Sequence, residues 1–158
     1  MSERWSVKVQ AEDFDVAALQ CELLQGDAAE GAVATFTGYV RNNNESRGVS
    51  CLELEHYPGM TERSIMEIIQ QASGRWPLFS AGVVHRVGSL NPGEQIVWVG
   101  VSSSHREAAF AACEFIMDYL KTRAPFLKRE TGDGGARWVD ARESDNQRAR
   151  RWQVQQQQ

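Results

Sequence analysis

The sequence predicts an α+β fold with a mainly antiparallel sheet. Three observations support this prediction: strand-like segments at the start of the chain, hairpins in the middle and at the end, and amphipathic helical segments between them. The 158 residues, of which 42% are hydrophobic, suffice for one domain with its own core. We therefore expect residues 1–152 to form a single domain and residues 153–158, QVQQQQ, to be a disordered polar tail.

The first half of the chain alternates strands with two amphipathic helices. Strands are expected where apolar and polar residues alternate, over residues 6–10, 31–40 and 49–57. Helices are expected where apolar residues recur every three or four positions, over residues 13–25 and 61–73. Asp13 or Asp15 is expected to cap the first helix, which carries Leu24 on its inward face and ends at Gly26. Gly74 is expected to end the second helix.

The second half is organised around an apolar strand that is followed by a helix. Residues 96–101 form an unbroken apolar run, which predicts a strand buried on both faces and paired with residues 81–88 through a turn at Asn91-Pro92-Gly93-Glu94. Ser104 and Glu107 have the spacing of a capping box, so the helix is expected to begin at Ser104.

Proline and glycine residues predict where this helix ends and where the last strands lie. Pro125 disfavours helical geometry at the preceding residue, so the helix is expected to end near Thr122 or Arg123. A hairpin is then expected between residues 126–130 and 136–139, because the glycine-rich segment between them favours a tight turn. Residues 142–152 follow as a charged helix.

Composition excludes several classes of protein. We find no apolar run near the roughly 18 residues that a membrane span needs, and no secretory signal pattern, so a cytoplasmic protein is expected. Cys21, Cys51 and Cys113 are odd in number and far apart, which favours buried thiols over a disulfide framework or a metal site. No G-x-G-x-x-G or P-loop motif is present, so a nucleotide-binding fold is not supported.

Positive charge is concentrated toward the C-terminus. Residues 1–120 hold 8 Lys or Arg against 16 Asp or Glu, whereas residues 121–158 hold 9 against 5. This balance favours a small anionic ligand or an acidic protein partner over nucleic acid. Only Lys8, Lys121 and Lys128 are lysines, and lysine, unlike arginine, can lose its proton when it is removed from water. Lys121 and Lys128 are therefore candidate catalytic groups, although pairing of Lys121 with Asp118 on the helix surface explains its position equally well.

Two further positions are candidate ligand contacts. His105 and Arg106, as the first residues of a helix, would place cationic side chains beside unpaired backbone N–H groups, which makes an anion site if this end is open. Arg41 ends a strand beside a polar loop. His85 is more readily explained as a hydrogen-bonded strand residue than as a metal ligand.

Five stretches of the chain resemble the catalytic subunit of molybdopterin synthase. They are TFTGYVRNNN (residues 35–44), LEHYPGMTE (54–62), HRVGSLNPGE (85–94), VGVSSSHREAAFAACEFIMDYLKTRAPFLKRE (99–130) and RWVDARESD (137–145). The resemblance covers roughly residues 30–152. It implies an α/β-hammerhead-type fold with an added small antiparallel sheet.

The resemblance implies a sulfurtransferase that needs no cofactor of its own. A small ubiquitin-like carrier subunit, ending in a Gly-Gly thiocarboxylate, would deliver sulfur to a cyclic pyranopterin monophosphate and form the dithiolene of molybdopterin. The family also implies a homodimer within a heterotetramer, with pockets that the other protomer can complete.

The resemblance also assigns roles to particular residues. It implies catalytic roles for Lys121 and Lys128. Substrate-binding positions implied by the family are Tyr39, Val40, Arg41, His105, Arg106, Lys121, Lys128, Arg129 and Glu130, and pocket-lining positions are Phe36, Met117 and Arg142. Many relatives carry lysine where this chain has Tyr39, so backbone contacts are expected at that position.

Two other functions are compatible with the residues. A module that only binds a partner's C-terminal tail would use the same cations to hold a carboxylate. An acyl-transfer or phosphate-ester enzyme would use Ser103 or Cys113 as nucleophile, yet Cys113 lies among apolar helix positions and Ser103 lacks a recognisable base.

Overall fold

The computed structural model describes residues 4–44, 47–139 and 143–156. These residues form nine strands and four helices in the order β1, α1, β2, β3, β4, α2, β5, β6, β7, α3, β8, β9, α4. The predicted α+β architecture with a mainly antiparallel sheet is confirmed. Among the described residues, the helices are too short or too polar to cross a membrane.

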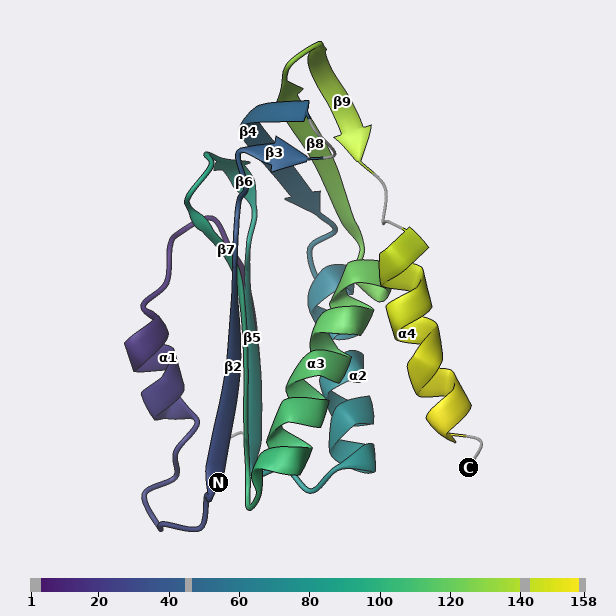
Figure 1. Cartoon of the computed structure of the whole chain (residues 1–158). Coiled ribbons are helices and arrows are strands. Elements are labelled where there is room, and N and C mark those ends of the chain that lie inside the picture. Colours follow the sequence, from purple (N-terminus) through teal and green to yellow (C-terminus); the bar gives the residue numbers. More distant parts are fainter. Residues whose placement is uncertain (1–3, 45–46, 140–142, 157–158) are drawn as a thin grey trace.

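A four-stranded sheet forms the centre of the molecule (Figure 1). Its strands, in spatial order, are β1 (Trp5–Gln10), β5 (Ser80–Arg86), β7 (Gln95–Ser103) and β2 (Ala32–Tyr39). The β1–β5 pair is parallel and the other two pairs are antiparallel. Strand β7 has neighbours on both sides and is buried from Val97 to Ser103, as its apolar run predicts.

Helices cover both faces of this sheet (Figure 1). Helix α1 (Val16–Glu22) lies on one face, and α2 (Met60–Arg75) and α3 (Arg106–Arg123) pack on the other. The main core between the sheet and α2 and α3 contains Ile65, Ile69, Val99, Phe115 and Ile116, each no more than 1% exposed. Helix α4 (Glu143–Gln156) packs on the outer side of α3.

A second, curled antiparallel sheet extends beyond one end of these helices (Figure 1). It contains β3 (Asn43–Asn44), β4 (Arg47–His56), β8 (Phe126–Gly132) and β9 (Gly135–Val139), and β6 (Gly88–Leu90) pairs with β4. The predicted hairpin β8–β9 is confirmed, with its turn at Asp133 and Gly134. Only Ala124 and Pro125 separate α3 from β8, so the end of α3 lies beside this sheet.

Helix α3 begins one residue later than the capping box predicts. Its N-cap is His105, which makes no side-chain capping bond, and Ser104 lies outside the helix. The cause is the sheet: Ala32 pairs with Ser103, and the Gly31 N–H donates to the Ser103 carbonyl at 3.0 Å. These contacts keep the chain extended to the end of β7. At its other end α3 stops at Arg123, as Pro125 predicts.

Four smaller expectations are corrected. Cys113 is buried as expected, but Cys21 is exposed and Cys51 is half-buried. Asp15 caps α1 by accepting from the Ala17 and Ala18 N–H groups, but the helix ends before Leu24, which is 49% exposed instead of buried. Helix α2 continues past Gly74 to Arg75. Helix α4 continues to Gln156, so the first four residues of the expected polar tail are helical.

Candidate functional site

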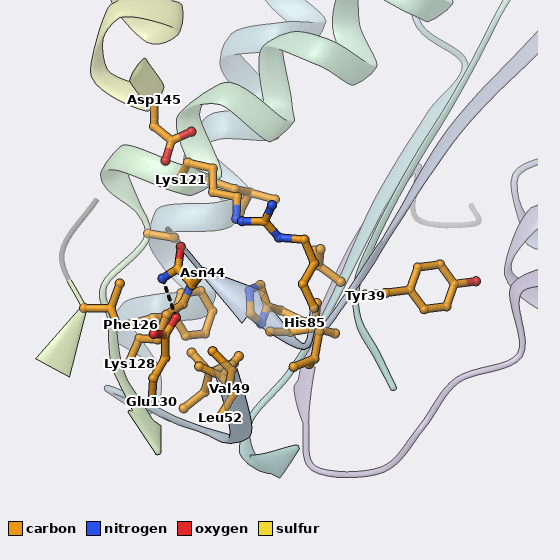
Figure 2. A pocket seen from close by; sticks show the side chains of 18 of the residues that line it. Tyr39, Asn44, Val49, Leu52, His85, Lys121, Phe126, Lys128, Glu130 and Asp145 are labelled. Atoms are coloured by element: carbon orange, nitrogen blue, oxygen red, sulfur yellow. Dashed lines mark hydrogen bonds between the residues drawn. The ribbon is translucent and has the colours of Figure 1, made fainter. Parts of the chain in front are cut away.

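A cavity of about 430 Å³ lies where the two sheets meet the C-terminal end of α3. Figure 2 shows the side chains that surround it. They come from the end of β2, from β3, β4, β5, β7, α3, β8 and β9, and from the start of α4. The charged groups that line the cavity are Arg41, Lys121, Lys128, Glu130 and Asp145.

Strand β8 supplies one wall of the cavity through its alternation. Phe126, Lys128 and Glu130 all line the cavity, because every second side chain of a strand points to the same face. Arg129 points to the other face, where it pairs with Glu53 and lies over the Trp138 ring. The cavity therefore contains Lys128 and Glu130 of the predicted contact run, but not Arg129.

The last turns of α3 supply the second wall. Met117 and Lys121 both line the cavity, because residues four apart lie on the same face of a helix. Lys121 and Lys128 thus share one cavity although they lie on a helix and a strand. The sequence indicates both as candidates, and the proline-fixed corner at Pro125 explains how they come together.

The end of β2 supplies Tyr39, Val40 and Arg41. The Val40 N–H donates to the Glu94 carbonyl at 2.9 Å, and the Val40 carbonyl accepts from Gly93 at 2.8 Å. These bonds fix the strand end and engage the backbone groups of Val40, one of the substrate-binding positions that the family resemblance implies. Tyr39 is 57% exposed, and its ring extends away from the other labelled side chains in Figure 2.

Negative charge inside the cavity is partly compensated by neighbouring groups. Glu130 is only 5% exposed, and its carboxylate accepts a hydrogen bond from the Asn44 amide at 2.6 Å. Arg137 approaches the same carboxylate at 3.6 Å from β9. Lys121, Lys128 and Arg41 line the same cavity, and their ionised donors form strong hydrogen bonds with carboxylate and phosphate oxygens, so the cavity is suited to an anionic ligand.

Several predicted site residues lie elsewhere. His105 and Arg106 are exposed at the opposite end of α3, and the separation of 15 positions between Arg106 and Lys121 corresponds to about 22 Å of helix. Phe36 is 42% exposed on β2 and does not line the cavity. Arg142 lies outside the described residues. A single copy of the chain therefore does not unite all the predicted contacts.

His85 is a hydrogen-bonded strand residue, as expected, but it also lines the cavity, which the sequence does not indicate. It lies on β5, partly buried, with its ring stacked on Phe126 at a centroid distance of 4.0 Å. Burial lowers the pKa of His85 from 6.5 to about 4, and the charges of Lys121 and Lys128 lower it further, against a hydrogen bond to the Arg86 carbonyl that raises it. The rarity of histidine could have drawn attention to it, since His85 is one of only three in the sequence. The residues near it in the sequence do not indicate which side chains surround it in the fold.

The alternative nucleophiles are not placed for chemistry. Ser103 is 1% exposed and donates to the Pro77 carbonyl at 2.7 Å, while burial raises the pKa of the Cys113 thiol to about 12. Neither lines the cavity. The described residues also contain no group of three or more His, Cys, Asp or Glu side chains arranged to hold a metal ion. The arrangement therefore favours binding of anions and stabilisation of developing negative charge by cations.

Comparisons with known proteins agree with this chemistry. Residues 9–123 match the family model described as "MoaE protein". The chain is 58% identical over 147 residues to the molybdopterin synthase catalytic subunit of Vibrio cholerae, covering 93% of this chain and 97% of that protein.

Two solved structures extend the comparison. The molybdopterin biosynthesis MoaE protein of Burkholderia ambifaria has a TM-score of 0.80 and 48% identity, covering 93% of this chain and 97% of that one. The fold is also shared, at 18% identity and a TM-score of 0.66, with a Helicobacter pylori chain solved in a complex of subunits 1 and 2 of molybdopterin-converting factor, covering 87% and 90% of the two chains.

Proposed function

The chain belongs to the MoaE family of molybdopterin synthase catalytic subunits, sulfurtransferases of molybdenum cofactor biosynthesis, and we propose that its cavity is where sulfur is transferred. The observation that carries this proposal is the meeting of Lys121, Lys128 and Arg41 around one cavity. We propose that the sulfur donor is the C-terminal Gly-Gly thiocarboxylate of a small carrier subunit and that the acceptor is a cyclic pyranopterin monophosphate. The reaction would take place in the cytoplasm.

The charges of the cavity suit these two substrates. A thiocarboxylate and a phosphate are both anions, so a pocket that holds them together needs several cations. Arg41, Lys121 and Lys128 supply positive charge within one chain. The partner is supported by the Helicobacter pylori complex, in which a chain of the same fold is assembled with a second subunit.

The two lysines act on the acyl group of the carrier. The carrier sulfur first bonds to a substrate carbon as an oxygen substituent of that carbon leaves. Water then adds to the carrier's carbonyl carbon, the bond between that carbon and sulfur breaks, and the carrier leaves as a carboxylate while sulfur stays on the pterin. The tetrahedral intermediate carries an oxyanion, which a nearby ammonium group stabilises. Lys121 and Lys128 orient the carrier's terminus and provide that charge, and one of them also moves a proton.

A second copy of the chain completes the site. Strand β2 is an edge of the central sheet, and Phe36 and Phe110 are 42% and 66% exposed on β2 and α3, as expected for a contact surface. His105 and Arg106 of one protomer would then bind the phosphate in the pocket of the other. The assembly is a homodimer with one carrier at each end, a heterotetramer.

Turnover of thiocarboxylated carrier and pterin substrate by single variants tests the catalytic proposal. Lys121→Ala is expected to abolish the sulfurated pterin while the protein still folds and still binds the carrier. Lys121→Arg separates charge from proton transfer, because arginine keeps its proton. If Lys121→Arg retained full turnover at ordinary pH, Lys121 would act by charge alone. A wild-type protein that bound the carrier but formed no product would be a tail-binding module without chemistry.

Mixing two inactive variants tests the shared pocket. Lys121→Ala and Arg106→Ala are each expected to be inactive as homodimers. In a mixed dimer, one of the two pockets has both residues intact, so an equilibrated equimolar mixture should recover about a quarter of wild-type activity. No recovery, with mixed dimers demonstrated by mass spectrometry, would mean that Arg106 serves the pocket of its own chain or none.

A further inference from the structure

The His85 ring is held in place from two directions. Its Nδ1 lies 2.9 Å from the carbonyl oxygen of Arg86, the next residue along β5. Its face stacks on Phe126 of β8, with 24° between the ring planes. Stacking and a backbone hydrogen bond together fix both the position and the rotation of the ring.

These contacts also determine which nitrogen is free to accept. A carbonyl oxygen only accepts, so Nδ1 carries the proton and Nε2 of the neutral ring carries a lone pair. The ring is neutral at physiological pH, because burial lowers the pKa of His85 to about 4 and the positive charges around it act in the same direction. Nε2 is therefore a hydrogen-bond acceptor at neutral pH.

The groups around His85 are mostly donors. The charges acting on the ring come from Lys121 on α3, Lys128 on β8 and His56 on β4, with Lys121 having the largest effect. The other charged groups that line the same cavity are Arg41, Glu130 and Asp145. Figure 2 shows His85 among the cavity side chains, beside Phe126. A neutral acceptor in this position is matched to an ammonium group.

We propose that His85 is a positioning residue for sulfur transfer: its Nε2 accepts a hydrogen bond from the Lys121 ammonium and directs that group at the carrier's acyl oxygen. This inference rests on the proposed function of the cavity. It gives β5 the role of a fixed hydrogen-bond acceptor. Neither lysine can perform this role, because lysine side chains are flexible and carry only donors. The ring contributes no negative charge, so it does not compete with the anionic substrates for the cations.

Two substitutions separate the acceptor from the shape of the ring. His85→Phe keeps an aromatic ring to stack on Phe126 but has no acceptor. His85→Gln loses the ring but can place an amide oxygen where Nε2 lies. We expect kcat of His85→Phe to fall roughly ten- to a hundredfold, the usual range for a lost hydrogen bond to a charged group, with KM for the carrier changed less than threefold. His85→Gln should recover most of this loss.

The pH dependence of kcat provides a readout that a packing role would not change. A hydrogen bond from an ammonium to a neutral acceptor favours the charged amine. Without it, the alkaline limb of the kcat profile should move to lower pH in His85→Phe and return toward the wild-type position in His85→Gln. If His85→Phe were more active than His85→Gln, and the alkaline limb of the kcat profile stayed at the wild-type pH in both variants, His85 would only pack against Phe126. This result would overturn the proposal.

A matched control and a reference variant make the outcome unambiguous. His56→Phe applies the same substitution to the neighbouring histidine, which pairs with Phe126 across the sheet but does not line the cavity, and should keep kcat within twofold. Thermal unfolding and carrier binding establish that each variant is folded. If wild type forms product and Lys121→Ala does not, the proposed function holds, and equal kcat for His85→Phe and wild type would then refute the positioning role alone.

Discussion

Asp118 is expected to hold α4 against α3, and removing its charge tests this. The Asp118 side chain is 7% exposed. It accepts from Trp152 Nε1 at 2.8 Å and from Arg148 and Arg151, each at 3.1 Å. An asparagine keeps only one accepting oxygen and turns an amide donor toward donors, so Asp118→Asn breaks part of this network.

The size of the expected loss of stability depends on how exposed each hydrogen-bonding partner of Asp118 is. The bond from Trp152 is buried, and a hydrogen bond to a charged group contributes about 1.5–3 kcal/mol. Arg148 and Arg151 are 52% and 42% exposed, so solvent reduces each of their contributions to about 0.2–1 kcal/mol. We expect Asp118→Asn to lower the free energy of unfolding by about 2–3 kcal/mol, or roughly 4–12 °C in Tm for a chain of this length.

Thermal unfolding followed by circular dichroism measures this effect. Glu114→Gln is the matched control, because Glu114 pairs with the same two arginines at 2.6 and 2.5 Å but is 44% exposed. Glu114→Gln should lower the free energy of unfolding by less than about 1 kcal/mol. If both variants unfolded within about 1 °C of each other, burial of the Asp118 network would not be what attaches α4.

Two further predictions concern titrating groups. Iodoacetamide at pH 8 should modify the exposed Cys21 and spare Cys113, whose pKa burial raises to about 12; peptide mass spectrometry would detect modified Cys113 if its helix opened. The pKa of His85 is about 4 in the folded chain against 6.5 unfolded, so its neutral form stabilises the fold above pH 6.5 and this contribution, up to about 3 kcal/mol, is lost as the pH falls to 4. The free energy of unfolding, measured in urea at pH 7 and at pH 4, should differ less between the two pH values for His85→Phe than for wild type. An equal difference in the two proteins would contradict the lowered pKa of His85.

Local pattern was sufficient to predict most of the elements. The apolar run of β7, the four-residue recurrence in α2, the Pro125 stop of α3 and the glycine turn of the β8–β9 hairpin depend on neighbouring residues alone. The candidate lysines were also visible in the sequence, since their spacing around Pro125 needs no distant contact. Roles for individual site residues came from resemblance to a family rather than from spacing.

Tertiary structure decided which faces meet. His85 and Phe126 are 41 residues apart, and their stacking depends on how β5 and β8 approach from two different sheets. Strand alternation excluded Arg129 from the cavity, and pairing of Ala32 with Ser103 moved the start of α3. The sequence by itself determined the elements and the cations, because periodicity and turn chemistry act within a few residues. The cavity required the fold, because its walls come from segments that only long-range packing brings together.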